Sequence, residues 1–176
     1  MSRPTLYLML GYPGAGKTTA AKLIASVTGA QHLWADNVRR EVYQKPTYSH
    51  KENIELYNNL NKAAQKLLEQ GKSVIFDTNF SFYRDRKHLM DIAQGAGART
   101  LVLWVQTPKG LAKQRAVVDA HLHSNTRVLG HMPEDNFERI SGNIEPPHDD
   151  EEYIELDGTK LTDDYVKQTL QSKQLF

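Results

Sequence analysis

The chain has 176 residues, and its 22 Lys and Arg against 21 Asp and Glu give a formal net charge of +1 at pH 7. We expect residues 1–176 to form a single domain, and a chain of this size buries about two-thirds of its unfolded surface. It contains no Cys, which excludes a disulfide framework, a thiolate zinc site and a cysteine nucleophile. The near-zero charge argues against a protein that binds nucleic acid over its whole surface, because such proteins are usually strongly basic.

No apolar run approaches the roughly 18 residues that a membrane-spanning helix needs. The first residues, MSRP, lead directly into a strand-like run, unlike the start of a secretory signal peptide. We therefore expect a cytoplasmic protein without a membrane segment.

Short apolar runs alternate with segments of helical period, which is typical of βαβ units around a parallel sheet. Five such runs predict strands, at residues 5–10, 31–35, 73–77, 101–105 and 153–156. Asp36 follows the second run and Asp77 ends the third. Trp34 and Trp104 lie within these runs and are predicted to be core residues.

Helices are predicted between the strands. The first covers residues 18–28 and ends at Gly29, and the last begins near Thr162. Ser49 and Glu52 have the spacing of a capping box at the start of a long helix. The buried stripe of that helix is predicted to consist of Ile54, Tyr57, Leu60, Ala64, Leu67 and Leu68.

Two polar stretches lie in the second half of the chain. Residues 111–147 have a low apolar density and predict a mobile lid rather than part of the core. Residues 149–152 (DDEE) predict a solvated loop before the fifth strand.

Residues 11–18, GYPGAGKT, match the phosphate-binding pattern GxxxxGK[ST] at every fixed position, between a predicted strand and a predicted helix. Such a loop points successive backbone N–H groups at phosphate oxygens, which requires Gly where φ is positive or where a Cβ would collide. Lys17 supplies a point charge for the β- and γ-phosphates, and Thr18 offers a hydroxyl to Mg²⁺. The predicted nucleotide-binding residues of the loop are Gly11, Pro13, Gly14, Ala15, Gly16, Lys17, Thr18 and Thr19.

Two classes of P-loop protein fit poorly. The guanine-binding pattern Asn-Lys-x-Asp is absent, since residues 61–64 (NKAA) lack its acid, which argues against a GTPase. A motor ATPase needs a further helical domain, for which 176 residues leave little room. A small kinase fits better.

Asp36 and Asp77 are the acids that a kinase needs at the strand ends. Asp36 is the candidate to accept the proton of an attacking hydroxyl, and Arg39 and Arg40 lie about one turn farther along to hold an anionic acceptor. Asp77 is the candidate to hold Mg²⁺ through a water molecule. The alternatives are an N-cap Asp36 beside two solvated arginines, and an Asp77 that belongs to a simple turn.

These motifs resemble those of a group of P-loop kinases, ATP-binding proteins of the AAA_33 type. The group includes the kinase domain of bacteriophage-type polynucleotide kinase, the zeta toxins, chloramphenicol phosphotransferase and gluconate kinase. The likeness rests on GYPGAGKTT, on Asp36-x-x-Arg39, on the segment VIFDTNF at residues 74–80, and on Arg115 in the lid. Asp-x-x-Arg followed by Asp-Thr-Asn is most similar to the polynucleotide kinase branch.

The resemblance implies a three-layer α/β/α P-loop NTPase fold with five parallel strands in the order 2-3-1-4-5 and a helical lid. It also implies that Asp36 is the general base, that Arg39 contacts an acceptor phosphate, and that Thr18 and Asp77 serve the metal. Arg115 or Arg127 is the lid cation expected to act with Lys17 on the γ-phosphoryl group, and Arg115 is also an expected nucleotide-binding residue. The expected cofactors are ATP and Mg²⁺.

Several functions remain open at this point. The first is an ATP-dependent kinase for a hydroxyl of a small metabolite or nucleotide, and a second has the 5′-hydroxyl of a nucleic acid as acceptor. An ATP-binding regulatory ATPase without an acceptor is the alternative from another class. An inactive nucleotide-binding module is disfavoured because Lys17, Thr18, Asp36 and Asp77 are all present.

Overall fold

The computed structural model describes residues 3–119 and 132–173, and its strands form one parallel sheet in the order β2-β3-β1-β4-β5. The predicted strand order is therefore confirmed. The strands are β1 (Thr5–Leu10), β2 (Gln31–Trp34), β3 (Val74–Asp77), β4 (Arg99–Gln106) and β5 (Tyr153–Asp157).

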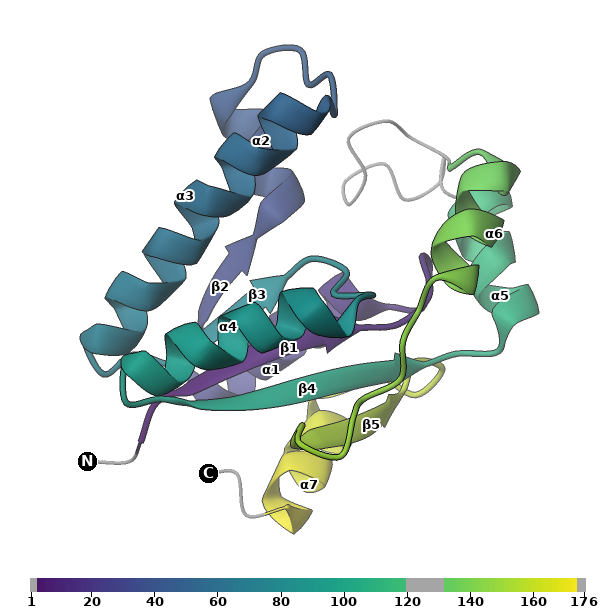
Figure 1. The fold of residues 1–176 in the computed structure, drawn as a ribbon. Helices are drawn as coiled ribbons and strands as arrows, with labels where there is room; N and C mark the ends of the chain where they lie inside the picture. Colours follow the sequence, from purple (N-terminus) through teal and green to yellow (C-terminus); the bar gives the residue numbers. More distant parts are fainter. Residues whose placement is uncertain (1–2, 120–131, 174–176) are drawn as a thin grey trace.

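Helices cover both faces of the sheet, so the molecule has three layers (Figure 1). Helices α3 and α4 pack on one face, and α1 and α7 pack on the other. The helices are α1 (Lys17–Thr28), α2 (Ala35–Val42), α3 (His50–Glu69), α4 (Tyr83–Gly95), α5 (Lys109–Lys113), α6 (Glu134–Gly142) and α7 (Asp163–Ser172), and a π-helical turn, η1 (Gln114–Val118), continues α5.

Alternation along the central strand divides the core into two halves. In β1, Leu6 and Leu8 face α3 and α4, whereas Tyr7 and Met9 face α1 and α7. All four are almost completely buried. The continuous apolar run of β1 thus reflects a strand covered on both faces.

The long helix α3 begins as predicted, and its predicted stripe is confirmed at Leu60, Ala64 and Leu68 but not in its first turns. Ser49 caps it by accepting a hydrogen bond from the backbone N–H of Glu52, at 3.3 Å. Leu56 lies in its buried stripe, whereas Ile54 is 49% exposed, so the predicted stripe is wrong at this end. The cause is that the first inward position belongs to Glu52, a charged residue that an apolar pattern does not reveal.

Parallel pairing brings the carboxyl ends of three strands to one edge of the sheet. Leu8 of β1 pairs with Phe76 of β3, and Trp34 of β2 pairs with Asp77 of β3. The segments that leave β1, β2 and β3 therefore start side by side at this edge, where ligands bind in open α/β sheets.

The described flanks of the predicted lid have a small core of their own. Ala112, Ala116 and Phe137 are fully buried, and Tyr12 packs against Phe137 with ring centroids 6.4 Å apart. The expectation that residues 111–147 contribute nothing to the core is therefore wrong for α5, η1 and α6. Residues 120–131 lie outside the described residues, and the lid motion stays a prediction.

The acidic run before β5 contains a buried ion pair. Glu151 is 6% exposed and receives two hydrogen bonds from Arg86, which is fully buried, at 2.6 and 2.9 Å. Arg86 also donates to the carbonyl oxygens of Phe80 and Pro146, at 2.8 and 3.2 Å. The prediction of a solvated loop is wrong at Glu151, because a partner 65 residues away neutralises its charge.

Within residues 3–119 and 132–173, none of the helices combines the length and the apolar character that a membrane crossing requires.

The Arg86–Glu151 pair predicts a large stability effect. Arg86→Met should lower the free energy of unfolding by about 3–5 kcal/mol, because it leaves the Glu151 carboxylate buried without its cation. Urea denaturation followed by circular dichroism measures this loss. The control Arg84→Met alters a neighbouring side chain that is 81% exposed and should change stability by less than about 0.5 kcal/mol. Equal, small losses in both variants would contradict the role assigned to the pair.

Candidate active site

The loop between β1 and α1 has the backbone geometry of a phosphate-binding loop. Gly11, Gly14 and Gly16 have φ angles of 151°, 79° and 105°. Side-chain-bearing residues rarely adopt such values, so the three glycines of the motif are required by the backbone itself. Lys17 and Thr18 begin α1, whose N-terminal N–H groups add to the site's attraction for anions.

The loop lies in close contact with segments from the second half of the chain. A Cβ on Gly14 would lie 2.2 Å from the carbonyl oxygen of Ala112 in α5. Thr107 donates a hydrogen bond to the carbonyl oxygen of Ala15, at 2.8 Å, and Gly158 has no room for a side chain between these two residues. Thr107 and Gly158 support the loop, and no sequence motif marks either of them.

Lys17 stabilises its own loop in this structure. Its Nζ donates to the carbonyl oxygens of Gly11 and Tyr12, at 2.9 and 2.8 Å. These two carbonyl groups hold the ammonium group beside the loop. A bound phosphate could replace them as its hydrogen-bond partner.

The Thr18 and Asp77 side chains meet, as the predicted metal site requires. Thr18 Oγ1 lies 3.4 Å from Asp77 Oδ1, and Asp77 is only 4% exposed. A hydroxyl and a carboxylate are hard oxygen donors, which suit Mg²⁺ together with water and phosphate oxygens. In the part of the chain that the structure describes, no cluster of three or more His, Cys, Asp or Glu would hold a metal alone.

His32 is a part of this site that sequence reasoning missed. Its Nε2 donates to Asp77 Oδ2 at 2.9 Å, so each oxygen of the carboxylate has a different neighbour. The His32 ring stacks on Trp34, with centroids 6.1 Å apart and planes 6° apart. The Trp34 ring also has Lys22 and Arg40 over it, at 4.9 and 5.1 Å. Trp34 is half-buried and so is Trp104, which corrects the prediction that both are core residues.

Asp36 lies in the first turn of α2, directly after β2. Burial raises the pKa of Tyr48 and of Tyr57, and the negative charge of Asp36 raises both further. The Tyr57 hydroxyl is also hydrogen-bonded to Thr78 Oγ1, at 2.8 Å. The Asp36 carboxylate thus acts electrostatically on two phenol groups, and one of them, that of Tyr57, is bonded to the segment after β3.

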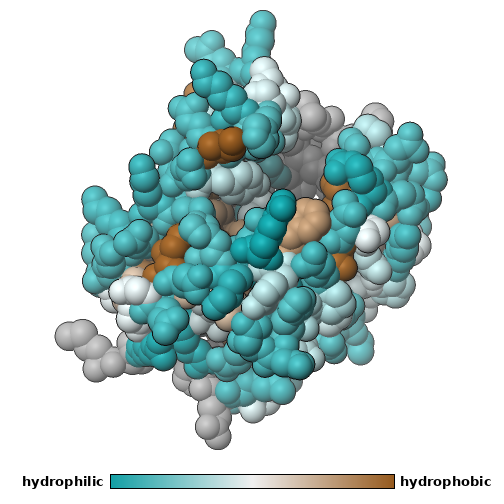
Figure 2. All heavy atoms as spheres, in the orientation of Figure 1, coloured by the Kyte–Doolittle hydropathy of each residue, from teal (hydrophilic) through white to brown (hydrophobic). Residues whose placement is uncertain are grey.

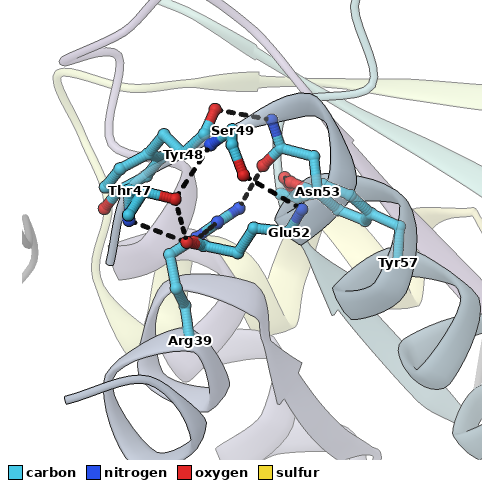
Figure 3. Close-up of polar contacts among 8 residues, drawn as sticks. Arg39, Thr47, Tyr48, Ser49, Glu52, Asn53 and Tyr57 are labelled. Atoms are coloured by element: carbon cyan, nitrogen blue, oxygen red, sulfur yellow. Dashed lines mark hydrogen bonds and ion pairs between the residues drawn. The ribbon is translucent and has the colours of Figure 1, made fainter. Parts of the chain in front are cut away.

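Arg39 is buried between α2 and α3 (Figure 3). Its guanidinium forms an ion pair with Glu52 and donates to Asn53 Oδ1 at 2.7 Å. The Tyr48 ring lies 4.3 Å from the guanidinium carbon. The sequence motif Asp-x-x-Arg is thus present, but here the arginine binds its own protein, and its contact with an acceptor phosphate stays a prediction.

Glu52 is held as a carboxylate by several donors. Burial raises its pKa, but hydrogen bonds from the backbone and hydroxyl of Thr47, both 2.7 Å, and from Arg39 and the Tyr48 backbone outweigh burial and lower the pKa to about 2. Glu52 therefore stays charged at physiological pH, so the Arg39–Glu52 contact is an ion pair under these conditions.

The lid cation Arg115 lies in the π-helical turn η1, a local geometry that is frequent at functional sites. Its Nη1 donates to the carbonyl oxygen of Gly158 at 3.3 Å, next to the P-loop. Arg127 lies outside the described residues. Around these elements the surface of the described residues is mostly hydrophilic (Figure 2).

Residues 6–147 match the family model of an AAA domain, AAA_33. The chain belongs to this family. An adenylate kinase from Anaeromyxobacter sp. (strain Fw109-5) is 30% identical over 90 residues, which make up 51% of this chain and 37% of that relative. The alignment thus spans little more than a third of the adenylate kinase.

Solved structures share the fold over almost the whole chain. A kinase structure from Chloroflexus aurantiacus has a TM-score of 0.77 at 17% identity, covering 97% of this chain and 98% of the other. A sugar kinase from Janibacter sp. HTCC2649 has a TM-score of 0.69 at 19% identity, covering 98% and 95%. Kti12 from Chaetomium thermophilum, solved with ADP-AlF3, has a TM-score of 0.71 at 18% identity, covering 96% and 97%. The fold is that of P-loop kinases, as the motifs predicted.

The low pKa of Glu52 predicts how stability depends on pH. A carboxyl whose pKa falls on folding stabilises the protein above its unfolded pKa, and this stabilisation is lost as the pH falls to the folded pKa. Glu52→Gln should therefore destabilise the protein at pH 7, and the gap to the wild type should close between about pH 4.5 and pH 2. Urea denaturation at pH 7, 5, 4 and 3 measures the gap. Glu55→Gln, an exposed change on the same helix, is the control. A gap that stays constant with pH would show that Glu52 does not titrate in this way.

Proposed function

We propose that the protein is a kinase that transfers the γ-phosphoryl group of MgATP to a hydroxyl, with Asp36 as general base. The observation that carries the proposal is the meeting of three elements at one sheet edge: the P-loop, the Thr18–Asp77 pair and Asp36. Family membership and the shared fold of P-loop kinases support it.

The P-loop and Lys17 bind the phosphates of ATP. Backbone N–H groups of residues 14–19 surround the phosphate oxygens, and Lys17 exchanges its two carbonyl partners for the β- and γ-phosphates. Phosphoryl transfer asks the protein mainly for positioning and charge stabilisation, which these groups provide.

Thr18 and Asp77 would hold Mg²⁺, which neutralises phosphate charge when bound. Thr18 offers a hydroxyl, and Asp77 acts directly or through a water molecule. His32 keeps the carboxylate of Asp77 in one orientation by its hydrogen bond to Oδ2.

Asp36 orients the acceptor hydroxyl and takes its proton. The acceptor oxygen then forms a bond to the γ-phosphorus, the bond from that phosphorus to the β–γ bridging oxygen breaks, and ADP leaves with the electron pair. Arg115 and Arg127 together with Lys17 stabilise the charge on the transferred group, and lid closure excludes the water that would otherwise hydrolyse ATP.

A regulatory ATPase without an acceptor is the second candidate. The ion pair of Arg39 with Glu52 favours this candidate, because a structural role explains the arginine of Asp-x-x-Arg without any acceptor. ATP hydrolysis that no added acceptor changes would favour this candidate over the kinase.

Substitutions at Asp36 and Lys17 separate binding from transfer. Asp36→Asn should keep ATP affinity but lower kcat by a factor of about 10² to 10⁴, because it removes the base. Lys17→Ala should lose nucleotide binding itself. Isothermal titration with AMPPNP measures binding, and a coupled ADP assay measures turnover. Full turnover in Asp36→Asn would sink the assignment of the base.

His32→Ala should weaken Mg²⁺ binding by roughly 10- to 100-fold, because the Asp77 carboxylate is then free to rotate away from Thr18. Calorimetric titration of Mg²⁺ into the AMPPNP-bound protein measures this without turnover. His32→Asn, which keeps a hydrogen-bond donor, should restore part of the affinity. His88→Ala, an exposed change on α4, is the control. Unchanged Mg²⁺ affinity in His32→Ala would remove His32 from the site.

A further inference from the structure

The cation of Asp36-x-x-Arg39 is neutralised inside the protein. Arg39 is 3% exposed and Glu52 is 6% exposed, and the two form an ion pair (Figure 3). A second nitrogen of Arg39 donates to Asn53, and the Tyr48 ring covers the guanidinium. Most of the N–H donors of Arg39 are therefore bonded within the protein, and its positive charge is balanced by Glu52.

A phosphate that pairs with Arg39 would have to compete with Glu52 for its guanidinium. That carboxylate has a pKa of about 2 and also accepts the N–H and the hydroxyl of Thr47. Its displacement would leave a buried carboxylate without a cation, which is strongly unfavourable. Arg40, the next cation of α2, has its guanidinium over the Trp34 ring.

Three neutral hydroxyl groups also belong to this region. Tyr48, Tyr57 and Thr78 present hydroxyl groups, and burial raises the pKa of both phenols, which keeps them protonated. Asn79 donates to Ser81 at 2.9 Å, while its Oδ1 is buried and has no hydrogen-bond partner among the described residues. Hydroxyls and amides are the groups that recognise hydroxyl-rich ligands.

Tyr48 is held in a strained conformation at this place. Its φ of 55° is left-handed, which no other non-glycine residue among the described ones adopts. Its carbonyl oxygen accepts from Asn53 at 3.2 Å, and its ring packs on Arg39. Such strain persists where the surrounding structure fixes a residue, and it is concentrated at functional sites. The wall beside Asp36 is thus preorganised.

We infer that the acceptor is a neutral, hydroxyl-rich small molecule, such as a sugar, a polyol or a nucleoside, and carries no phosphate. The Arg39–Glu52 pair forms a wall of its pocket and supplies no net charge to it. This inference rests on the proposed kinase function and deepens it, because it names the chemical class of the acceptor.

The test uses acceptors that differ in one phosphate. The coupled ADP assay is run with neutral sugars, polyols and nucleosides, with the matching sugar phosphates and nucleoside 3′-monophosphates, and with oligonucleotides bearing a free 5′-hydroxyl. A neutral acceptor should be used with a kcat/KM at least about tenfold above that of its phosphorylated partner. Higher kcat/KM for the phosphorylated partner, or for oligonucleotides, would overturn the inference while the kinase function stands. Absence of transfer to every acceptor would overturn both.

Variants of the ion pair give a second, independent readout. Glu52→Gln leaves the charge of Arg39 uncompensated, so it should reduce the preference for the neutral acceptor by about tenfold. Glu55→Gln, exposed on the same helix, should leave the preference unchanged.

The double variant Arg39→Met/Glu52→Met replaces the pair by apolar side chains. It removes one positive and one negative charge, so it should keep the preference for the neutral acceptor over its phosphorylated partner, whatever its effect on kcat/KM itself. A double variant with normal circular dichroism and AMPPNP affinity that loses about tenfold or more in kcat/KM toward the phosphorylated partner alone would mean that Arg39 binds the acceptor phosphate. That outcome would overturn the inference. If a variant does not fold, the acceptor panel with the wild-type protein still tests the inference.

Discussion

The close backbone packing of the P-loop is the constraint on which the rest of the site depends. The N–H groups of such a loop point inward, and its outer side packs on other segments of the same chain. Here Gly14 lies against the carbonyl group of Ala112, and Gly11 lies against the carbonyl group of Val105. The base of the predicted lid is therefore part of the frame of the phosphate site. Arg115 follows Ala112 in the next turn and donates to the carbonyl oxygen of Gly158, beside the P-loop.

Two buried ion pairs then fix segments that have little apolar surface. Arg39 and Glu52 join the short helix α2 to α3, and Arg86 and Glu151 join α4 to the segment before β5. In both, the planar guanidinium binds a carboxylate and also further oxygen atoms, so most donors are satisfied. The pairs supply positional accuracy at places where the hydrophobic effect alone has too little area to act.

Local sequence determines the parts that the patterns predicted. Strands such as β1 are covered on both faces, and the P-loop needs glycine at fixed positions, so both leave a signature in consecutive residues. The inward turn of Glu52 and the burial of Glu151 leave none, since each depends on an arginine supplied by another element. His32 belongs to the same class, because only the register of β2 with β3 brings it beside Asp77.

The division of charge across the crevice has a physical reason under the proposed function. The strong positive centre is Lys17 with the N-terminus of α1, and it attracts the phosphates of ATP. A net positive charge on the acceptor side would attract phosphates as well, and ATP or ADP would then compete with the acceptor for its own pocket. The ion pair with Glu52 removes the contribution of Arg39 to this competition, which favours the nucleotide on the Lys17 side and a neutral acceptor on the α2–α3 side.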